Sequence, residues 1–444
     1  MRTLRNIVVL GANGVMGSGS AALFASAGLA VTLLARTRDR AEAGRARAEA
    51  LAKGRIAPGA IAVGSYDHDL EAAVAGADFV LEAVAEDEAV KRELLARVDR
   101  AIVASEAGPG MITPGTGTIV ATVTSGLSIA TLADALSPEV RRRFLGVHLF
   151  NPPTQIRGTE VIGHVETDAS VIAHVRAWLE TDLDRVVIEC ADLPAFAGNR
   201  IGFKVLNEVA QQVELYGVAA IDQLLGAHTG RALPPLATID LVGWDVHAAI
   251  VDHLWIETAD EAHASFRLPD YMRRGIERGH LGRKTRELGG FYRVVGKGEL
   301  AERMVLDPAS GDYRPFEAPP VPTFVERMRA AVRACDHAGA LDALCRADGD
   351  DAALLRRVLL GYVSYALCRV GECVTAARDV DLIMGFGFHW APPTMLVDAI
   401  GAGRTAGMLD AMGLPVPPVV DDAARTGRPL YAEATLPTKY FAAA

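Results

Sequence analysis

The stretch Ile7-Val-Val-Leu-Gly-Ala-Asn-Gly-Val-Met-Gly17 decides the fold of the N-terminal part of this chain. Its first four residues are apolar and typical of a buried strand, and glycines follow at Gly11, Gly14 and Gly17. Glycines at a strand-to-helix turn let the backbone bend tightly and approach a pyrophosphate, and the N-terminus of the next helix supplies N–H donors. The stretch therefore predicts a nucleotide-binding β-α-β unit.

The alternation of strands and helices continues beyond this unit. Val31–Leu34, Ala77–Val84 and Gly117–Thr124 are apolar runs typical of buried strands, and charged helical stretches separate them. This order predicts a doubly wound, parallel α/β sheet of the Rossmann type. After Glu189 the sequence becomes mostly helical, with long helices expected over Gly198–Tyr216 and Ala353–Gly371.

The fold class we predict is a Rossmann-type α/β N-terminal domain followed by mostly α-helical C-terminal domains. The predicted bounds are residues 1–190 for the dinucleotide-binding domain, 191–295 for a helical domain, 296–345 for a linker rich in Gly and Pro at its start, and 346–444 for a second helical repeat. The repeat is inferred from paired residues at similar spacings, namely Asp222 and Asp381, Pro234-Pro235 and Pro392-Pro393, Asp240 and Asp398, and Gly243 and Gly401.

The composition bounds the classes of partner. The formal charge of −10 disfavours nucleic acid, which would require a basic face. No apolar run approaches the roughly 20 residues of a membrane span, and the N-terminus does not have the pattern of a signal peptide. The five cysteines are widely spaced and include no CxxC pair, which favours a reducing, cytoplasmic location and predicts no metal site.

Four side chains suited to acid–base chemistry follow the nucleotide-binding stretch. Ser125 lies in Thr124-Ser-Gly-Leu, His148 in Gly146-Val-His-Leu-Phe-Asn-Pro152, Glu160 in Thr-Glu-Val-Ile, and Asn199 in Asp192-Leu-Pro-Ala-Phe-Ala-Gly-Asn-Arg200. This order resembles the L-3-hydroxyacyl-CoA dehydrogenase family, in its long form with a duplicated helical domain. The resemblance is strong from Ile7 to Tyr292 and weaker after Ala353.

The resemblance implies an oxidoreductase that interconverts (S)-3-hydroxyacyl-CoA and 3-oxoacyl-CoA. Oxidation of a secondary alcohol removes a hydride from carbon and a proton from oxygen, and a well-placed histidine moves that proton efficiently. We therefore expect His148 to be the acid–base group and Glu160 to orient its ring. A loop or returning strand would bring Glu160 back to His148. Ser125 and Asn199 are expected to donate hydrogen bonds to the developing oxyanion.

The residues expected to bind the dinucleotide come from the glycine turn and from family positions. They are Gly11, Asn13, Gly14, Val15, Met16, Gly17, Arg36, Glu86, Lys91 and Asn151. The resemblance implies NAD. NADP stays open, because the second strand ends in Leu34-Ala-Arg-Thr-Arg38, where NAD enzymes carry an acidic residue, and Arg36 could pair with a 2′-phosphate.

The chain departs from the family pattern at three places. The glycine spacing is GxxGxxG, so that Asn13 stands where the middle glycine is expected and the turn is one residue longer. Val123 replaces a polar residue before Ser125, and a Gly-Pro-rich loop is inserted from Gly108 to Gly117. These departures bear on rate and cofactor choice more than on the type of reaction.

The resemblance implies an acyl-CoA thioester as substrate and a homodimer, with a monomer open if the second helical repeat occupies the pairing surface. Neither nucleic acid nor a membrane is expected as a partner. Two other functions stay open. A β-hydroxyacid dehydrogenase would use a Lys-x-x-Asn motif, which Lys204-Val-Leu-Asn207 matches. A non-catalytic dinucleotide-binding protein is the other, since the cofactor turn is altered.

Overall fold

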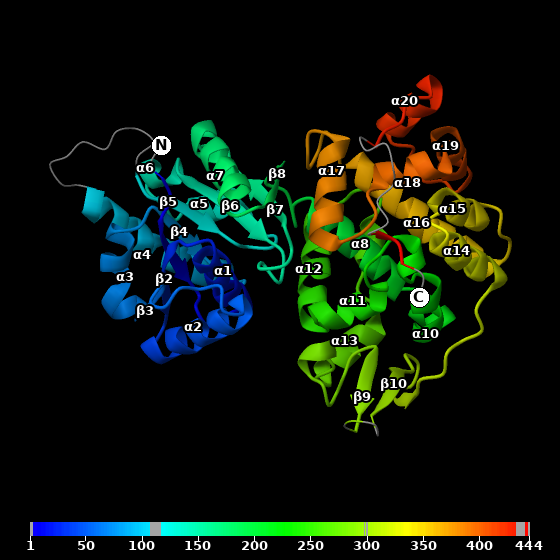
Figure 1. The fold of residues 1–444 in the computed structure, drawn as a ribbon, viewed down its shortest axis with the longest axis horizontal. Coiled ribbons are helices and arrows are strands. Elements are labelled where there is room, and N and C mark those ends of the chain that lie inside the picture. The colour runs from blue at the N-terminus through cyan, green and yellow to red at the C-terminus, as the bar shows by residue number, and fades with distance from the viewer. Residues whose placement is uncertain (1–2, 107–116, 297, 299–300, 432–439, 443–444) are drawn as a thin grey trace. The chain divides into compact units, whose positions relative to one another are not determined.

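The computed structural model describes residues 3–106, 117–296, 298, 301–431 and 440–442 (Figure 1). The inserted loop predicted from Gly108 to Gly117 therefore lies, except for its last residue, outside the described part. The chain forms two compact units, Met1–Phe196 and Ala197–Ala444, here called the N-terminal and the C-terminal unit.

The N-terminal unit is built on one eight-stranded sheet with the strand order β3-β2-β1-β4-β5-β6-β7-β8. Its strands are β1 (Asn6–Leu10), β2 (Ala30–Ala35), β3 (Ile61–Ser65), β4 (Phe79–Glu82), β5 (Ile119–Thr122), β6 (Phe144–Leu149), β7 (Gly158–Ile162) and β8 (Val186–Cys190). Its helices are α1 (Val15–Ser26), α2 (Arg38–Ala52), α3 (Tyr66–Ala75), α4 (Glu88–Glu106), α5 (Ile129–Ala133), α6 (Pro138–Arg141) and α7 (Ala169–Thr181).

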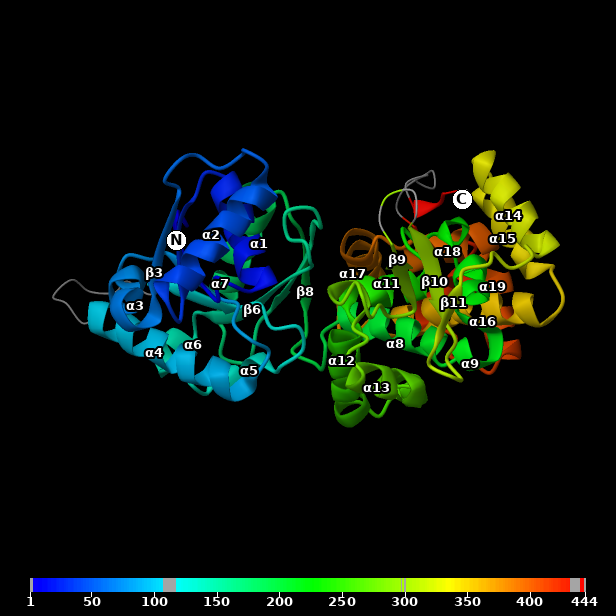
Figure 2. The same ribbon diagram turned by 90° about the horizontal axis from the view of Figure 1, so that it is seen from below.

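Helices cover both faces of this sheet (Figures 1 and 2). Buried residues of α1, α2 and α7 form one core with alternate strand residues such as Ile7 and Val9. The alternate residues of the same strand, Val8 and Leu10, point to the opposite face and are also buried. The opposite face is therefore covered as well. Because strand side chains alternate between faces, continuous apolar strands require helices on both sides. The predicted doubly wound Rossmann-type fold is thus confirmed.

One strand pair departs from the parallel order. The pairs from β3 to β6 are parallel, whereas β6 and β7 are antiparallel and β7 and β8 are again parallel. The antiparallel pair follows from a short connection, since the chain turns back after Leu149 and re-enters the sheet at Gly158. In this register His148 lies directly opposite Glu160.

The C-terminal unit is mostly helical, with a small antiparallel sheet in the order β11-β10-β9. Its elements are α8 (Gly198–Ala210), α9 (Val213–Tyr216), α10 (Val218–Leu224), η1 (Ala227–Thr229), α11 (Pro235–Val242), α12 (Trp244–Glu257), η2 (His263–Phe266), α13 (Asp270–Glu277), η3 (Gly282–Lys284), β9 (Tyr292–Val295), β10 (Glu302–Leu306), β11 (Tyr313–Pro315), α14 (Thr323–Arg333), α15 (His337–Cys345), α16 (Asp350–Cys368), α17 (Ala377–Ile383), the π-helix η5 (Met384–Phe388), α18 (Pro393–Ile400), α19 (Ala402–Ala411) and α20 (Pro418–Thr426).

The range 296–345, predicted as a linker, contains much regular structure. Strands β10 and β11 and helices α14 and α15 lie within it, and they contribute buried residues such as Val305 and Met328. The density of Gly and Pro that suggested a linker belongs to the turns between these short elements. The domain bounds themselves stay a prediction.

The aspartates that suggested an internal repeat have matching tasks. Asp222 accepts hydrogen bonds from the backbone N–H groups of Leu236 and Ala237 at the start of α11. Asp381 accepts one from the N–H of Thr394 at the start of α18. Each carboxylate satisfies helix N–H groups that have no partner within the helix.

The second pair of aspartates also matches. Asp240 accepts from the backbone N–H groups of Phe291 and Tyr292, and Asp398 accepts from those of Leu430 and Tyr431. Gly243 and Gly401, both with positive φ, precede the next helix in each copy. The shared capping and turn geometry supports an internal duplication of the helical unit.

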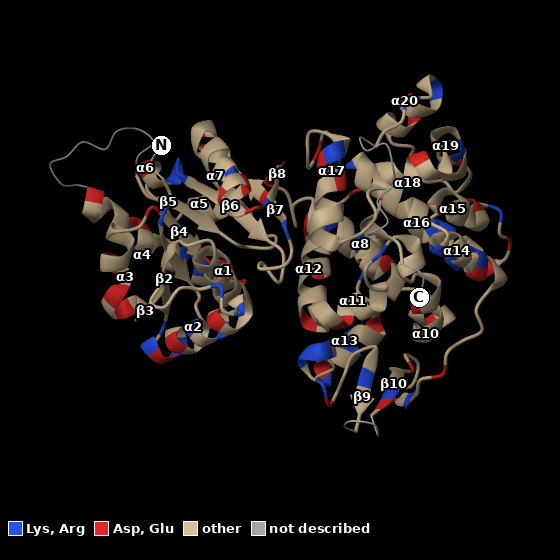
Figure 3. Cartoon of the chain, viewed as in Figure 1, with Lys and Arg blue, Asp and Glu red and all other residues tan. Residues whose placement is uncertain are grey.

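Acidic and basic residues are interspersed along the helices of each unit (Figure 3). Among the described residues, none of the helices combines the length and the apolar character that crossing a bilayer requires.

Candidate active site

His148 and Glu160 form a buried hydrogen-bonded pair in the sheet of the N-terminal unit. His148 Nδ1 lies 2.6 Å from Glu160 Oε2, and the two side chains are 4% and 0% exposed. Their strands β6 and β7 place them opposite each other, which explains how residues separated by twelve positions meet. A carboxylate accepts only, so Nδ1 carries the hydrogen, and in the neutral ring Nε2 is the acceptor.

Two aromatic rings flank the imidazole. The ring centroid of His148 lies 4.7 Å from that of Phe150 and 5.7 Å from that of Phe196. Both contacts are tilted, and all three side chains are buried. Because the rings restrict rotation about the His148 side chain, they fix the direction in which Nε2 points.

Ser125 is held through its backbone by Glu86. The N–H of Ser125 donates to Glu86 Oε1 at 2.8 Å, and the hydroxyl of Thr124 donates to the same oxygen at 2.6 Å. The loop that carries Ser125 is also anchored by Asp192, which accepts from the N–H groups of Ile129 and Ala130. Two predicted residues, Ser125 and Glu86, are thus brought together.

Lys91 joins Glu86 to a second carboxylate that the sequence analysis did not single out. Lys91 Nζ lies 3.0 Å from Glu82 Oε1 and 3.3 Å from Glu86 Oε2. Glu82 also accepts from the hydroxyl of Thr122 at 2.6 Å and from the N–H of Val84 at 2.6 Å. The signal for Glu82 was its place as the one charged residue near the end of an apolar strand.

The glycine turn has the close backbone approaches that a dinucleotide site requires. Gly11 has φ +99°, and a Cβ there would lie 2.2 Å from the carbonyl oxygen of Ala83. A Cβ on Gly17 would lie 2.1 Å from the carbonyl oxygen of Gly11. Helix α1 begins at Val15, and its N-cap, Gly14, has no side chain that could accept from the first N–H groups of the helix. These N–H groups lie at the end of the helix that follows the glycine turn. Strand, turn and helix therefore fit a bound pyrophosphate.

The longer turn is braced from helix α2. Arg47 Nη1 donates to the carbonyl oxygen of Asn13 at 2.7 Å. The Tyr66 hydroxyl interacts with the backbone of Gly11. Burial raises the pKa of this hydroxyl to about 12, although the contact with Gly11 lowers it, and the Glu82 carboxylate adds to the rise. Asn13 is exposed, so its side chain fits the expected position of a residue that faces the cofactor.

The end of strand β2 carries the residues that bear on cofactor choice. Arg36 follows the strand directly and is exposed, and Arg38 is the first residue of α2. Thr37 caps that helix, accepting from the N–H of Arg40 at 3.4 Å. The described structure thus presents a guanidinium, and no carboxylate, directly after β2.

Asn151 and Asn199 are predicted site residues that we place only by the element that carries each of them. Asn151 follows Phe150 at the end of β6 and is exposed. Asn199 is the second residue of α8 and belongs to the C-terminal unit. The pairing of Asn199 with His148, Glu160 and Ser125 stays a prediction.

The residues of the alternative Lys-x-x-Asn motif have structural partners within the C-terminal unit. Lys204 Nζ lies 2.8 Å from Glu208 Oε2, and the lysine is 5% exposed. Asn207 Nδ2 donates to the carbonyl oxygens of Ser265 and Arg267. Glu208, one helical turn away, compensates the charge of Lys204. Asn207 holds the backbone at Ser265 and Arg267.

Other basic residues near the predicted site are paired as well. Arg157 forms an ion pair with Asp184. Arg200 is buried and lies 2.8 Å from both Asp260 Oδ2 and Glu372 Oε1. Neither arginine therefore stands out as a binding group for a CoA phosphate.

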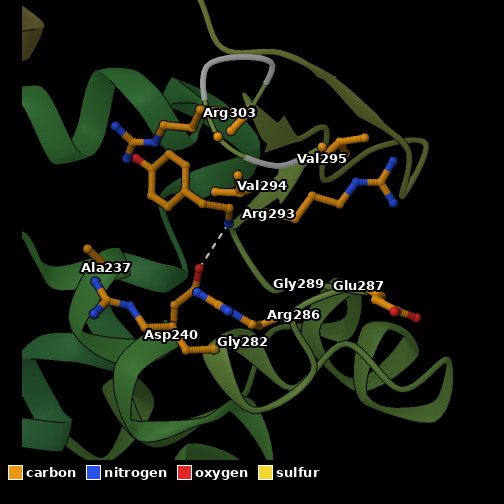
Figure 4. A pocket seen from close by; sticks show the side chains of 15 residues that line it. Ala237, Asp240, Gly282, Arg286, Glu287, Gly289, Arg293, Val294, Val295 and Arg303 are labelled. Atoms are coloured by element: carbon orange, nitrogen blue, oxygen red, sulfur yellow. Dashed lines mark hydrogen bonds between the residues drawn. The ribbon is translucent and has the colours of Figure 1, made fainter.

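The cavity in Figure 4 lies in the C-terminal unit and is lined in part by residues of the segment Gly279–Tyr292. The contacts of this segment are structural. Asp240 accepts hydrogen bonds from Trp244 Nε1 and from the N–H groups of Phe291 and Tyr292. Burial raises the pKa of Asp240 to about 6, although these donors lower it. The Arg303 guanidinium stacks 4.1 Å from the centroid of the Tyr292 ring. These contacts close the first helical repeat.

No group of His, Cys, Asp and Glu with the arrangement of a metal site occurs among the residues that the structure describes. Two polar clusters of the N-terminal unit bear on the predicted site, the His148–Glu160 pair and the Glu82–Lys91–Glu86 group.

Two family models match most of the chain. Residues 6–193 match the model described as 3-hydroxyacyl-CoA dehydrogenase, NAD binding domain, and residues 196–294 match the 3-hydroxyacyl-CoA dehydrogenase, C-terminal domain. A probable 3-hydroxyacyl-CoA dehydrogenase of Bacillus subtilis is 29% identical over 93% of this chain, and the chain spans about half (53%) of that relative. A 3-hydroxybutyryl-CoA dehydrogenase of Mycobacterium tuberculosis is 30% identical, covering 65% of this chain and 98% of that protein.

Solved structures agree on the fold. The crystal structure of a 3-hydroxybutyryl-CoA dehydrogenase from Escherichia coli covers 96% of this chain and 99% of its own length, with a TM-score of 0.68 and 20% identity. An (S)-3-hydroxybutyryl-CoA dehydrogenase from Ralstonia eutropha covers 64% of this chain and 97% of its own, with a TM-score of 0.54 and 27% identity.

Proposed function

Because the chain belongs to the 3-hydroxyacyl-CoA dehydrogenase family, we propose that it interconverts (S)-3-hydroxyacyl-CoA and 3-oxoacyl-CoA, with a nicotinamide dinucleotide as hydride carrier. The observation that carries the proposal is the buried contact of 2.6 Å between His148 Nδ1 and Glu160 Oε2, in the same sheet as the glycine turn. Family membership supports an oxidoreductase, and the contact supports a specific proton-transfer pair.

His148 acts as the acid–base group through Nε2. In the oxidation direction Nε2 takes the proton of the substrate hydroxyl, and in reduction it returns that proton to the oxygen. The Glu160 carboxylate stabilises the positive charge that the ring acquires, since it lies at hydrogen-bond distance in a site that excludes water. Phe150 and Phe196 keep the ring in the orientation that this transfer requires.

Ser125 and Asn199 complete the proposed site as donors to the substrate oxygen. A carbonyl that becomes an alkoxide gains negative charge, and preorganised donors stabilise it. The support for Ser125 is that Glu86 and Asp192 fix its loop. For Asn199 it is only the place in the family motif.

The dinucleotide supplies the hydride acceptor or donor when it is bound. Residues of the glycine turn, Gly11 to Gly17, would hold the pyrophosphate, and Glu86, Lys91 and Asn151 would line the nicotinamide end. We propose NAD, the cofactor in the description of the matching N-terminal model. Arg36 favours NADP as the alternative, because a guanidinium after β2 can pair with a 2′-phosphate. A homodimer, implied by the resemblance, and a cytoplasmic location, expected from the cysteine pattern, belong to the same proposal.

The test follows the absorbance of NADH and of NADPH with acetoacetyl-CoA, and then with longer 3-oxoacyl-CoA thioesters. We expect turnover with one of the two cofactors. Binding of dinucleotide without consumption across the acyl series would instead support a non-catalytic protein.

Two variants identify the acid–base group. We expect His148→Gln to lower kcat by about 10²- to 10⁴-fold, the range for loss of general acid–base catalysis. Lys204→Met is the matched comparison, because the β-hydroxyacid dehydrogenase alternative requires it to be the more damaging change. A smaller loss for His148→Gln than for Lys204→Met would overturn the proposed mechanism.

A further inference from the structure

The carboxylate of Glu160 has a neighbour on each side. Its Oε2 lies 2.6 Å from His148 Nδ1 on strand β6, and its Oε1 lies 3.4 Å from Cys190 Sγ, at the end of strand β8. Glu160 is 0% exposed and Cys190 is 7% exposed. Three adjacent strands therefore each contribute one side chain to a continuous, buried row.

The direction of the Cys190 contact follows from the chemistry of its partners. A carboxylate has only acceptor sites, whereas a thiol has one weak S–H donor. A more distant acceptor near Sγ is the carbonyl oxygen of Ile188, at 4.0 Å. The shorter contact thus assigns the S–H hydrogen to Glu160 Oε1.

We infer that Cys190 is a positioning residue of the proton-transfer pair, a conclusion that rests on the function proposed above. Its S–H group holds Glu160 Oε1 and thereby keeps Oε2 directed at His148 Nδ1. In this role the thiol affects the reaction only through the carboxylate that it contacts.

The geometry explains why such a contact affects catalysis. Rotation of the Glu160 carboxylate by a fraction of a turn would lengthen the 2.6 Å contact that stabilises the protonated ring. A donor from β8 opposes that rotation, because Cys190 lies on the strand beyond Glu160 as seen from His148. The register supports this contact. Cys190 of β8 lies opposite Ile162 of β7, which is two residues after Glu160 and therefore on the same face of the sheet as Glu160. The ring's charged form, which occurs during the reaction, gains most from the contact.

The kinetic test compares Cys190→Ala with Cys190→Ser. Because the thiol is a weak donor and the carboxylate a charged acceptor, loss of this one hydrogen bond predicts that Cys190→Ala lowers kcat by about 3- to 10-fold. We expect it to shift the pH at which kcat/KM falls to half and to leave the dissociation constant of the dinucleotide unchanged. Cys190→Ser keeps a donor and should restore most of the activity. Cys335→Ser, at an exposed cysteine, is the control without effect.

The infrared S–H stretching band tests the contact without any turnover. The difference spectrum between the wild-type protein and Cys190→Ala isolates the Cys190 band, which should lie at lower wavenumber than the band isolated in the same way for Cys335. Glu160→Gln should move the Cys190 band to higher wavenumber, because a neutral amide is a weaker acceptor. This measurement separates the two proposals, since a protein that is inactive on acyl-CoA still reports the contact.

Several outcomes would overturn the inference. One is a Cys190 band that Glu160→Gln does not move. Another is an equal loss of activity in Cys190→Ala and Cys190→Ser with no change in the pH profile, which would indicate a packing role. Thermal unfolding of each variant identifies a general loss of structure, and the infrared result for the folded wild type then decides.

Discussion

Lys91 Nζ lies 3.0 Å from both carboxylate oxygens of Glu82, and the two side chains are only 1% and 0% exposed. The pair joins the end of β4 to the first turns of α4, and through Val84 and Thr122 it fixes the backbone beside the glycine turn. If one partner is replaced, the other charge stays buried without water and without a counter-ion. Replacing either residue alone therefore destabilises the folded protein strongly.

Lys91→Met should therefore destabilise the protein by about 3–5 kcal/mol, the range for breaking a buried ion pair. Urea unfolding measures this loss. Lys284→Met is the matched control, because Lys284 pairs with Asp245 at the surface, where the side chains are 40% and 42% exposed. A surface pair contributes about 0–1 kcal/mol, so similar losses in the two variants would contradict the role assigned to Lys91.

Gly17→Ala should abolish dinucleotide binding and lower the melting temperature. The added Cβ would lie 2.1 Å from the carbonyl oxygen of Gly11, so α1 cannot keep its distance from the turn. Binding is measured by titration with NADH and NADPH, and stability by thermal unfolding. Gly403→Ala, in the exposed start of α19, meets no atom within 4 Å and should leave both properties unchanged or raise stability slightly. Unimpaired binding by Gly17→Ala would disprove the close approach.

Glu160→Gln should lower kcat by about 10²- to 10⁴-fold while leaving dinucleotide binding intact. The amide cannot stabilise the protonated ring as a carboxylate does, and its NH₂ group can direct the imidazole into the wrong tautomer. Initial rates with saturating substrate measure the effect. Glu180→Gln, at an exposed residue paired with Arg176, is the comparison and should retain wild-type rates. Retention of more than a tenth of the activity by Glu160→Gln would argue against the proton-transfer pair.

His247 makes stability depend on pH. Asn207 Nδ2 is committed to two carbonyl oxygens, so its Oδ1 accepts from His247 Nε2 at 3.1 Å, and Nδ1 is buried with no hydrogen-bond partner among the described residues. Burial lowers the pKa of His247 to about 3. The unfolded chain then binds the proton more readily than the folded one as pH falls below about 6.5.

The free energy of unfolding is therefore highest above the pKa of His247 in the unfolded chain, about 6.5. It decreases as the pH falls toward the pKa of about 3 in the folded protein. Between pH 7.5 and pH 5 this histidine should reduce the free energy of unfolding by about 2 kcal/mol. His247→Gln should remove that part of the pH dependence in urea unfolding, whereas His68→Gln, at an exposed histidine, should not. The same slope in all three proteins would show that His247 does not titrate as described.

Local patterns in the sequence were enough to predict most of the N-terminal unit. The runs around Val31 and Phe79 became strands β2 and β4 because continuous apolar residues can be buried on both faces only inside a covered sheet. Strand β3 (Ile61–Ser65) was not predicted, since Ala62 and Gly64 weaken its apolar pattern. The long helix expected over Gly198–Tyr216 is divided at Gln211 and Gln212 into α8 and α9, where no proline or glycine signals a break.

The site was predictable residue by residue, but its connections were not. The motif around His148 and Glu160 named the pair, and the structure places the two together through an antiparallel register that no local signal specifies. Glu82 and Cys190 were missed as site residues because each is the last residue of its strand, and only the contacts with neighbouring elements show its role. The tasks of Asp222 and Asp381 became visible only with the helix starts that they cap.

The hairpin of β6 and β7 has an evolutionary consequence. Because the acid–base pair is aligned by strand pairing, the part of the connection that follows Phe150 and Asn151, residues 152–157, can change in length or sequence without separating the two groups. A single inserted residue within either strand would instead turn one of them to the other side of the sheet. Descendants of this chain are therefore free to remodel that connection for new substrates while the chemistry is inherited intact.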